Sequence, residues 1–135
     1  MAFKTINNFM GFPYLVAVRV PVRKTKSGDV IDLDPSVLEK AAAAAIISHI
    51  VPLHGKEVRF LRKVAGLSCE KFSREFGLSA STVLRWEQSQ DDRLTLPNEV
   101  AVRMFFAERF KLTLPSAFSE LIGKGQVEQI ELKIA

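Results

Sequence analysis

Hydroxyl and basic side chains recur at short, fixed spacing between Gly66 and Glu87, in the stretch GLSCEKFSREFGLSASTVLRWE. A serine at the first position of a helix, together with the free backbone N–H groups there, can bind an anionic oxygen such as that of a phosphate. An arginine has a planar fork that can donate two hydrogen bonds to the O6 and N7 of guanine. The chemistry available to this stretch is therefore hydrogen bonding to phosphates and to base edges.

The spacing of the same residues predicts two short helices joined by a tight turn. Ser68 can cap the first helix with its hydroxyl, and Phe72 and Phe76 fall four residues apart on one face of it. Gly77 favours the left-handed backbone conformation that ends a helix. Ser79 can then cap the second helix.

The second helix has an inner and an outer side. Val83 and Trp86 are predicted to face back toward the two phenylalanines of the first helix. The outer side then carries Ala80, Ser81, Leu84 and Arg85. A helix held in this way presents a convex rod about as wide as the major groove of DNA, and its small N-terminal residues can approach base edges.

This stretch resembles the Cro/cI-type (XRE) helix-turn-helix, whose pattern runs Gly-Leu-Ser-Gln, Leu-Ala, Gly-Val-Ser, Ser-Thr-Val and Arg-Trp-Glu. The chain keeps Gly66, Leu67, Ser68, Gly77, Ser79, Ser81, Thr82, Val83, Arg85, Trp86 and Glu87. It departs from the family at Cys69, where a glutamine helps to hold a phosphate, and at Ser73, where a small alanine faces the helix crossing. Helix-turn-helix corners also occur in domains that bind nothing, but matches at this fixed spacing favour DNA binding.

The resemblance implies a role for individual residues. Base contacts are expected from Ala80, Ser81 and Arg85, although Arg85 could instead pair with a phosphate or with a glutamate of its own helix. Phosphate contacts are expected from Arg62, Lys63, Ser68, Ser79, Thr82 and Gln88. Glu87 is expected to pair with Arg62 and so to fix one helix against the other, as the matching residues do in the family.

A second resemblance begins at Gly55. The string GKEVRFLRK over residues 55–63 is similar to the segment that leads into the helix-turn-helix of MqsA- and HigA-like type II antitoxins. It implies an antitoxin that binds a ribonuclease-like toxin and represses its own operon as a homodimer on a palindromic operator. The paired cysteines of the zinc domain in that family are absent, so no zinc role is expected. A stand-alone or phage-type XRE repressor, or a protein-interaction module that does not bind DNA, are the alternatives.

Composition and charge set further limits. The chain has 135 residues, of which 47% are hydrophobic and 25% charged, and this is typical of a soluble globular domain. Residues 55–90 hold seven basic and four acidic side chains, so the net charge of +4 is concentrated around the helix-turn-helix, although this could also be a solvated face. A single cysteine and the lack of a long apolar run or export signal predict a cytoplasmic protein that does not enter a membrane.

No catalytic pattern is present in the sequence. His49 and His54 lie five residues apart without a carboxylate or second cysteine to complete a ligand set. The serines lack a nucleophile elbow, there is no glycine-rich phosphate loop, and Cys69 lies beside Glu70 rather than a histidine. We therefore expect neither an enzyme nor a metal or cofactor site.

The flanking segments predict a mainly α (α+β) fold. Period-two alternation over 12–23 and a return strand over 30–33 indicate an N-terminal β-hairpin, with Pro13 and Pro21 placing its strand at an edge or introducing bulges. Helices are expected over 35–50, where the alanine run 41–45 allows close packing within this chain or with a partner, and over 55–65, 97–110 and 115–122. The alternating residues 127–134 could complete a sheet with the hairpin.

The predicted organisation is a five-helix Cro/cI-type helix-turn-helix domain between two smaller segments. Residues 1–53 form the hairpin and the alanine-rich helix, for partner binding or dimerisation; residues 54–112 form the DNA-binding domain; residues 113–135 form a C-terminal helix and strand. The helix over 97–110 is apolar around much of its circumference, which indicates a core or a subunit interface. We expect the dimer to form through residues 100–110 and the C-terminal segment.

Overall fold

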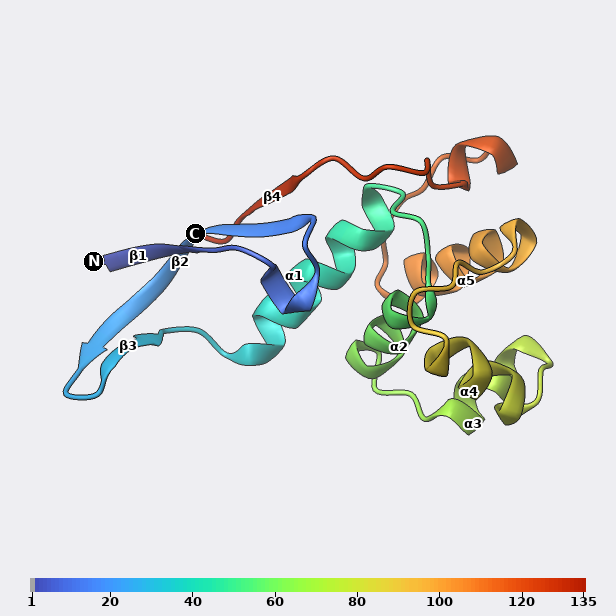
Figure 1. Cartoon of the computed structure of the whole chain (residues 1–135), viewed down its shortest axis with the longest axis horizontal. Helices are drawn as coiled ribbons and strands as arrows, with labels where there is room; N and C mark the ends of the chain where they lie inside the picture. Colours follow the sequence, from blue (N-terminus) through green and yellow to red (C-terminus); the bar gives the residue numbers. More distant parts are fainter. Residues whose placement is uncertain (1) are drawn as a thin grey trace. The chain divides into compact units, whose positions relative to one another are not determined.

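The computed structural model describes residues 2–135 and shows an α+β fold with five α-helices and a four-stranded sheet (Figure 1). The strands are β1 (Ala2–Ile6), β2 (Leu15–Thr25), β3 (Gly28–Ile31) and β4 (Ile130–Lys133). The helices are α1 (Pro35–Ser48), α2 (Gly55–Val64), α3 (Cys69–Phe76), α4 (Ala80–Gln88) and α5 (Leu96–Arg109), with 3-10 turns η1 (Phe9–Gly11) and η2 (Phe118–Leu121).

The chain forms two compact units. One contains the residues up to Ala45 together with Gln126–Ala135, and the other contains Ile46–Gly125. This division differs from the ranges 1–53, 54–112 and 113–135 expected from the sequence. The reason is that β4 pairs with β2, whereas residues 46–53 and 113–125 belong to the helical unit.

The sheet is built around β2. β1 pairs with β2 antiparallel, β3 pairs antiparallel with residues 22–25 of β2, and β4 pairs parallel with residues 15–18 of β2. The hairpin expected from the sequence is thus present, but β1 was not anticipated, and Pro21 lies in the central strand rather than at an edge. Pro21 has no N–H to donate to the ladder, but its carbonyl oxygen accepts a hydrogen bond from the Asp32 N–H at 2.8 Å.

A bulge accompanies this arrangement. Lys4 pairs with Val20 and Ile6 with Ala17, so β2 carries one more residue than β1 across this interval. Arg19 lies in the interval with a φ of 54°, a left-handed value that is uncommon for a residue other than glycine. Its Nε donates to the Ala135 carbonyl oxygen at 3.0 Å, and its guanidinium lies 4.4 Å from the centre of the Phe3 ring.

An aromatic cluster forms the core of the helical unit. Phe72 of α3 is fully buried, and its ring lies 5.3 Å from each of the rings of Phe105 and Phe106 on α5, between centroids. Phe76 packs against Phe72 and Phe105 at 5.0 Å. The two phenylalanines of α3 therefore fix that helix against α5, a contact that the pattern of α3 and α4 alone did not predict.

A buried carboxylate connects α5 to both ends of the helical unit. Glu99 is fully buried and accepts hydrogen bonds from the backbone N–H groups of Leu53 at 3.0 Å and Gly123 at 2.8 Å, and from Nε of Arg93 at 2.8 Å. Arg103, also fully buried, donates to Glu99 and to the carbonyl oxygens of Val51 and Leu121. Burial raises the pKa of Glu99, but its bonds to Arg93, Gly123 and Leu53 outweigh this and lower the pKa below its ordinary value.

Candidate nucleic-acid interface

Helices α3 and α4 are joined by the three residues 77–79, and each helix begins after a serine. The Ser68 hydroxyl accepts a hydrogen bond from the Lys71 N–H at 3.1 Å, and the Ser79 hydroxyl accepts one from the Thr82 N–H at 3.3 Å. Gly77 ends α3 with a φ of 68°, in the left-handed region. The first residues of α4 are therefore fixed both by the turn before them and by the cap.

A glycine permits the close approach of α2 and α4. A Cβ atom at Gly55 would clash with the carbonyl oxygen of Trp86 and would lie 2.7 Å from that of Ser89. The N–H group of Gly55 donates to the carbonyl oxygen of Asp92, and that of Lys56 to the carbonyl oxygen of Gln90, at 3.2 Å each. Both acceptors lie in the segment that follows α4. The start of α2 thus rests directly on the end of α4, a role for Gly55 that sequence reasoning missed because the contact joins residues more than thirty positions apart.

An ion pair between Arg62 and Glu87 joins α2 to α4. Arg62 Nε and Nη2 donate to the two carboxylate oxygens of Glu87 at 2.7 Å each, and Nη1 donates to the Leu67 carbonyl oxygen at 2.9 Å. The side chain of Arg62 is 12% exposed and that of Glu87 only 5%. The hydrogen bond to Glu87 raises the pKa of Arg62. All three guanidinium nitrogens donate to protein acceptors, so Arg62 holds α4 against α2.

Cys69 and Ser73 are the two positions at which the chain departs from the XRE pattern, and Cys69 lies next to this pair. The Cys69 thiol lies 3.7 Å from Oε2 of Glu87, and burial together with the negative charge of Glu87 raises the pKa of Cys69. The thiol is therefore protonated at neutral pH and able to donate. The Ser73 hydroxyl donates to the Cys69 carbonyl oxygen at 2.5 Å, so it bonds back to its own helix.

The outer side of α4 is exposed to solvent. Ser81, Leu84, Arg85 and Gln88 are exposed, Ala80 and Thr82 are half-buried, and Val83 and Glu87 are buried. Within residues 2–135, the side chain of Arg85 has no hydrogen bond or ion pair, and neither has that of the exposed Lys63 at the end of α2. One alternative for Arg85 was an ion pair with a glutamate of its own helix, and the structure does not contain that pair.

Three hydroxyl groups gather at the first turn of α4. The Ser79 Oγ lies 3.0 Å from the Ser81 Oγ and 2.9 Å from the Thr82 Oγ1. One lone pair of Ser79 is already taken by the Thr82 N–H, so Ser79 can accept from one neighbouring hydroxyl and donate to the other. This leaves one hydroxyl proton in the group free to donate to an anionic oxygen, next to the unpaired N–H groups of the first helical turn.

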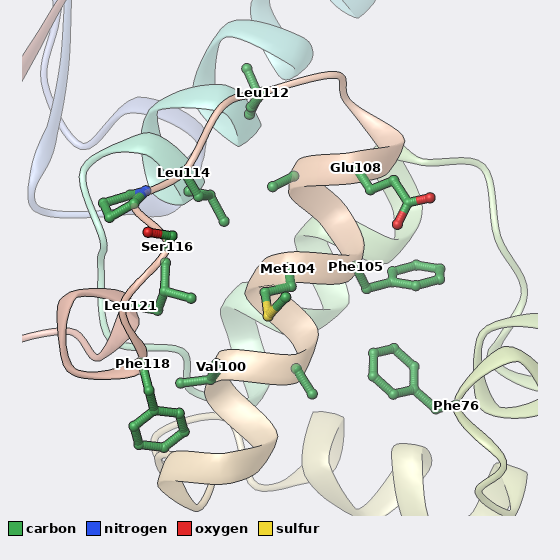
Figure 2. Close-up of a pocket in the computed structure, with 13 residues that line it drawn as sticks. Phe76, Val100, Met104, Phe105, Glu108, Leu112, Leu114, Ser116, Phe118 and Leu121 are labelled. Atoms are coloured by element: carbon green, nitrogen blue, oxygen red, sulfur yellow. The ribbon is translucent and has the colours of Figure 1, made fainter.

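A groove of about 620 Å³ lies along α5 in the same unit (Figure 2). It is lined by Phe76, Val100, Ala101, Met104, Phe105, Ala107, Glu108, Leu112, Leu114, Pro115, Ser116, Phe118 and Leu121. Met104 is 54% exposed and Phe118 is 55% exposed. Two large apolar side chains of this lining are thus exposed to solvent.

No protein-family model matches this chain, and searches of curated proteins and of solved structures find no match either. Across residues 2–135, no group of three or more histidine, cysteine, aspartate or glutamate side chains is arranged to hold a metal ion. Over the same residues, none of the helices has both the length and the apolar character needed to cross a bilayer.

Proposed function

We propose that this chain is a sequence-specific DNA-binding regulator that inserts α4 into the major groove in a Cro/cI-type arrangement. The observation that carries the proposal is the exposed outer side of α4, where Arg85 has no partner within residues 2–135. An arginine that is held on a fixed helix but unpaired in the free protein is available for a bidentate contact with guanine. The serine caps and the pair between Arg62 and Glu87 keep that helix in place.

The proposed roles of the residues rest on the XRE resemblance and agree with the exposure of these residues. Arg85, Ser81 and Ala80 face the base edges. Phosphates are held by Lys63, Ser68, Ser79, Thr82 and Gln88, which lie at helix ends or carry free donors. Arg62 acts with Glu87 as a positioning pair instead of a phosphate contact.

We further propose that the protein is a homodimer that pairs through the groove on α5. One short recognition helix covers only a few base pairs, and two-fold pairing gains affinity from two half-sites about one helical turn apart. The exposed Met104 and Phe118 provide the apolar surface that such an interface needs. The expected operator is therefore palindromic.

The proposed biological role is that of a cytoplasmic type II antitoxin that represses its own operon. It rests on the resemblance of residues 55–63, and on β1, which forms an edge of the sheet and could accept an added strand from a toxin. A neighbouring gene for a small ribonuclease-like toxin, neutralised when the two proteins are co-expressed, is the expected finding. The absence of such a gene would favour a stand-alone or phage-type repressor.

A protein-interaction module that does not bind DNA is the second candidate. The apolar groove on α5 favours it, because a groove of this kind could hold a partner protein instead of a second copy.

Selection of duplexes from a random library by the purified chain distinguishes the two candidates. A regulator should enrich one palindromic sequence and bind it with a strong dependence on salt concentration. An interaction module should enrich none.

A further inference from the structure

Leu84 is a large apolar side chain on the outer side of α4 and is 47% exposed. It does not complete the core, to which this part of α4 contributes the fully buried Val83. Nor does it belong to the set of hydrogen-bonding residues assigned above. Its exposure on the proposed DNA-binding face therefore requires an explanation of its own.

Helical geometry places Leu84 within that face. Successive side chains of an α-helix are rotated by about 100°. Counted from Ala80, Leu84 lies about 40° around the axis, Ser81 about 100° and Arg85 about 140°. Leu84 thus lies between Ala80 and Ser81, so a surface that contacts Ala80, Ser81 and Arg85 together also covers Leu84.

The chemistry of the major groove offers one matching group. An isobutyl side chain can neither donate nor accept a hydrogen bond, and placing it against a polar base edge removes water from that edge without replacing its hydrogen bonds. Thymine is the one standard base that presents an apolar group in the major groove, its C5-methyl. Contact with this methyl would remove apolar surface of both partners from water.

We propose that Leu84 contacts the C5-methyl group of a thymine in each half-site and determines specificity at that base pair, independently of Arg85. This inference rests on the proposed function, because it requires α4 to lie in the major groove. It adds a second specificity-determining residue whose preference is apolar and does not depend on hydrogen bonds. The competing occupant is a partner protein that covers Leu84 together with Leu78, which is also exposed in the turn before α4.

The test uses the full chain and the duplex it enriches from a random library. In each duplex one thymine position is replaced by deoxyuridine, which lacks only the methyl group. The replacement is made at the equivalent position of both half-sites. Fluorescence anisotropy at one fixed salt concentration then gives the dissociation constant for each duplex. For the wild-type chain, one thymine per half-site should show binding weakened about fourfold per half-site, as expected for one methyl group returned to water.

The same series is repeated with Leu84→Ala and with Leu78→Ala as a matched control. Leu84→Ala should weaken binding to the thymine duplex and should no longer distinguish thymine from deoxyuridine at the sensitive position. Leu78→Ala should keep the distinction, since Leu78 precedes α4. Circular dichroism establishes that both variants are folded. The deoxyuridine series with the wild-type chain tests the inference even if a variant fails to fold.

Two results would overturn the inference while leaving the proposed function intact. One is specific binding by the wild-type chain with no thymine position sensitive to loss of the methyl group. The other is an unchanged sensitivity in folded Leu84→Ala. If the wild-type chain enriches no sequence, the proposed function itself is wrong and the role of Leu84 falls with it.

Discussion

Two arginines of the helical unit have opposite surroundings. Arg62 donates to three protein oxygens and is nearly buried, whereas Arg85 is exposed and has no polar partner within residues 2–135. A guanidinium that is held on both oxygens of a carboxylate can reorient only by breaking those bonds, while an unpaired one on a fixed helix can bind without breaking an existing contact. Under the proposed function, this contrast gives Arg62 a positioning role and Arg85 a recognition role.

The pair between Arg62 and Glu87 should contribute strongly to stability. Replacing Glu87 with glutamine leaves the Arg62 charge largely buried without its counter-charge, so the free energy of unfolding should fall by about 3 kcal/mol. Urea unfolding followed by circular dichroism measures the change. Glu75→Gln is the control, because Glu75 and Arg109 form an exposed pair at 3.6 Å, and its effect should stay below about 1 kcal/mol. Equal effects of the two substitutions would contradict the positioning role.

Lys63 is expected to contact the phosphate backbone. Lys63→Ala should weaken binding to all DNA sequences alike, because a phosphate contact carries no base information. The slope of log K against log salt should become shallower by about one unit. Titrations at four salt concentrations with the selected duplex and with a scrambled one measure both effects. A loss confined to the selected duplex would mean that Lys63 recognises a base.

At the scale of elements, the contact between α2 and α4 depends on the absence of a side chain at Gly55. Gly55→Ala should force the start of α2 away from the Trp86 and Ser89 carbonyl groups and lower the free energy of unfolding by about 1–3 kcal/mol. Gly125→Ala is the matched control, because an added Cβ there meets no atom within 4 Å. Thermal unfolding of the two variants gives the comparison. A Gly55→Ala variant as stable as the control would show that α2 and α4 do not approach this closely.

Glu99 makes the helical unit sensitive to acid. Its pKa is lowered in the folded state, so its contribution to stability is present above the pKa of the unfolded chain and is lost as the pH falls through the folded pKa. Glu99→Gln should lower stability at pH 7 and flatten its decline in the acidic range. Urea unfolding between pH 7 and pH 3 tests this, and a Glu99→Gln profile parallel to that of the wild-type chain would contradict it.

Sequence patterns predicted the local elements better than the contacts between them. The caps at Ser68 and Ser79 depend on neighbours three residues away, and the structure has both. The alternation over 127–134 also predicted that this segment could join the sheet, and β4 does pair with β2. The parallel direction of that pairing and the network around Glu99 depend on segments far apart in the chain, which a periodic pattern cannot specify. One signal for the network was missed. Glu99 and Arg103 lie four residues apart in an apolar helix, and this spacing could have predicted a buried ion pair.

At the scale of the molecule, the groove on α5 is proposed to hold a second copy. Met104→Glu should convert the dimer to a monomer by placing a charge in the apolar interface, and sedimentation velocity at micromolar concentration measures this. Leu96→Glu is the control, because Leu96 is exposed on the same helix but does not line the groove. A wild-type chain that is monomeric, or two variants with the same effect, would contradict this interface.

The most direct test of the central claim compares wild-type and Arg85→Ala binding to the selected duplex and to a scrambled duplex at one salt concentration. Loss of a bidentate contact to guanine should weaken binding to the selected duplex by about 5- to 150-fold per half-site and change binding to the scrambled duplex far less. The preference at one base pair per half-site should disappear. If Arg85→Ala weakened both complexes by the same factor, α4 would not recognise base sequence through Arg85, and the proposed mechanism would be wrong.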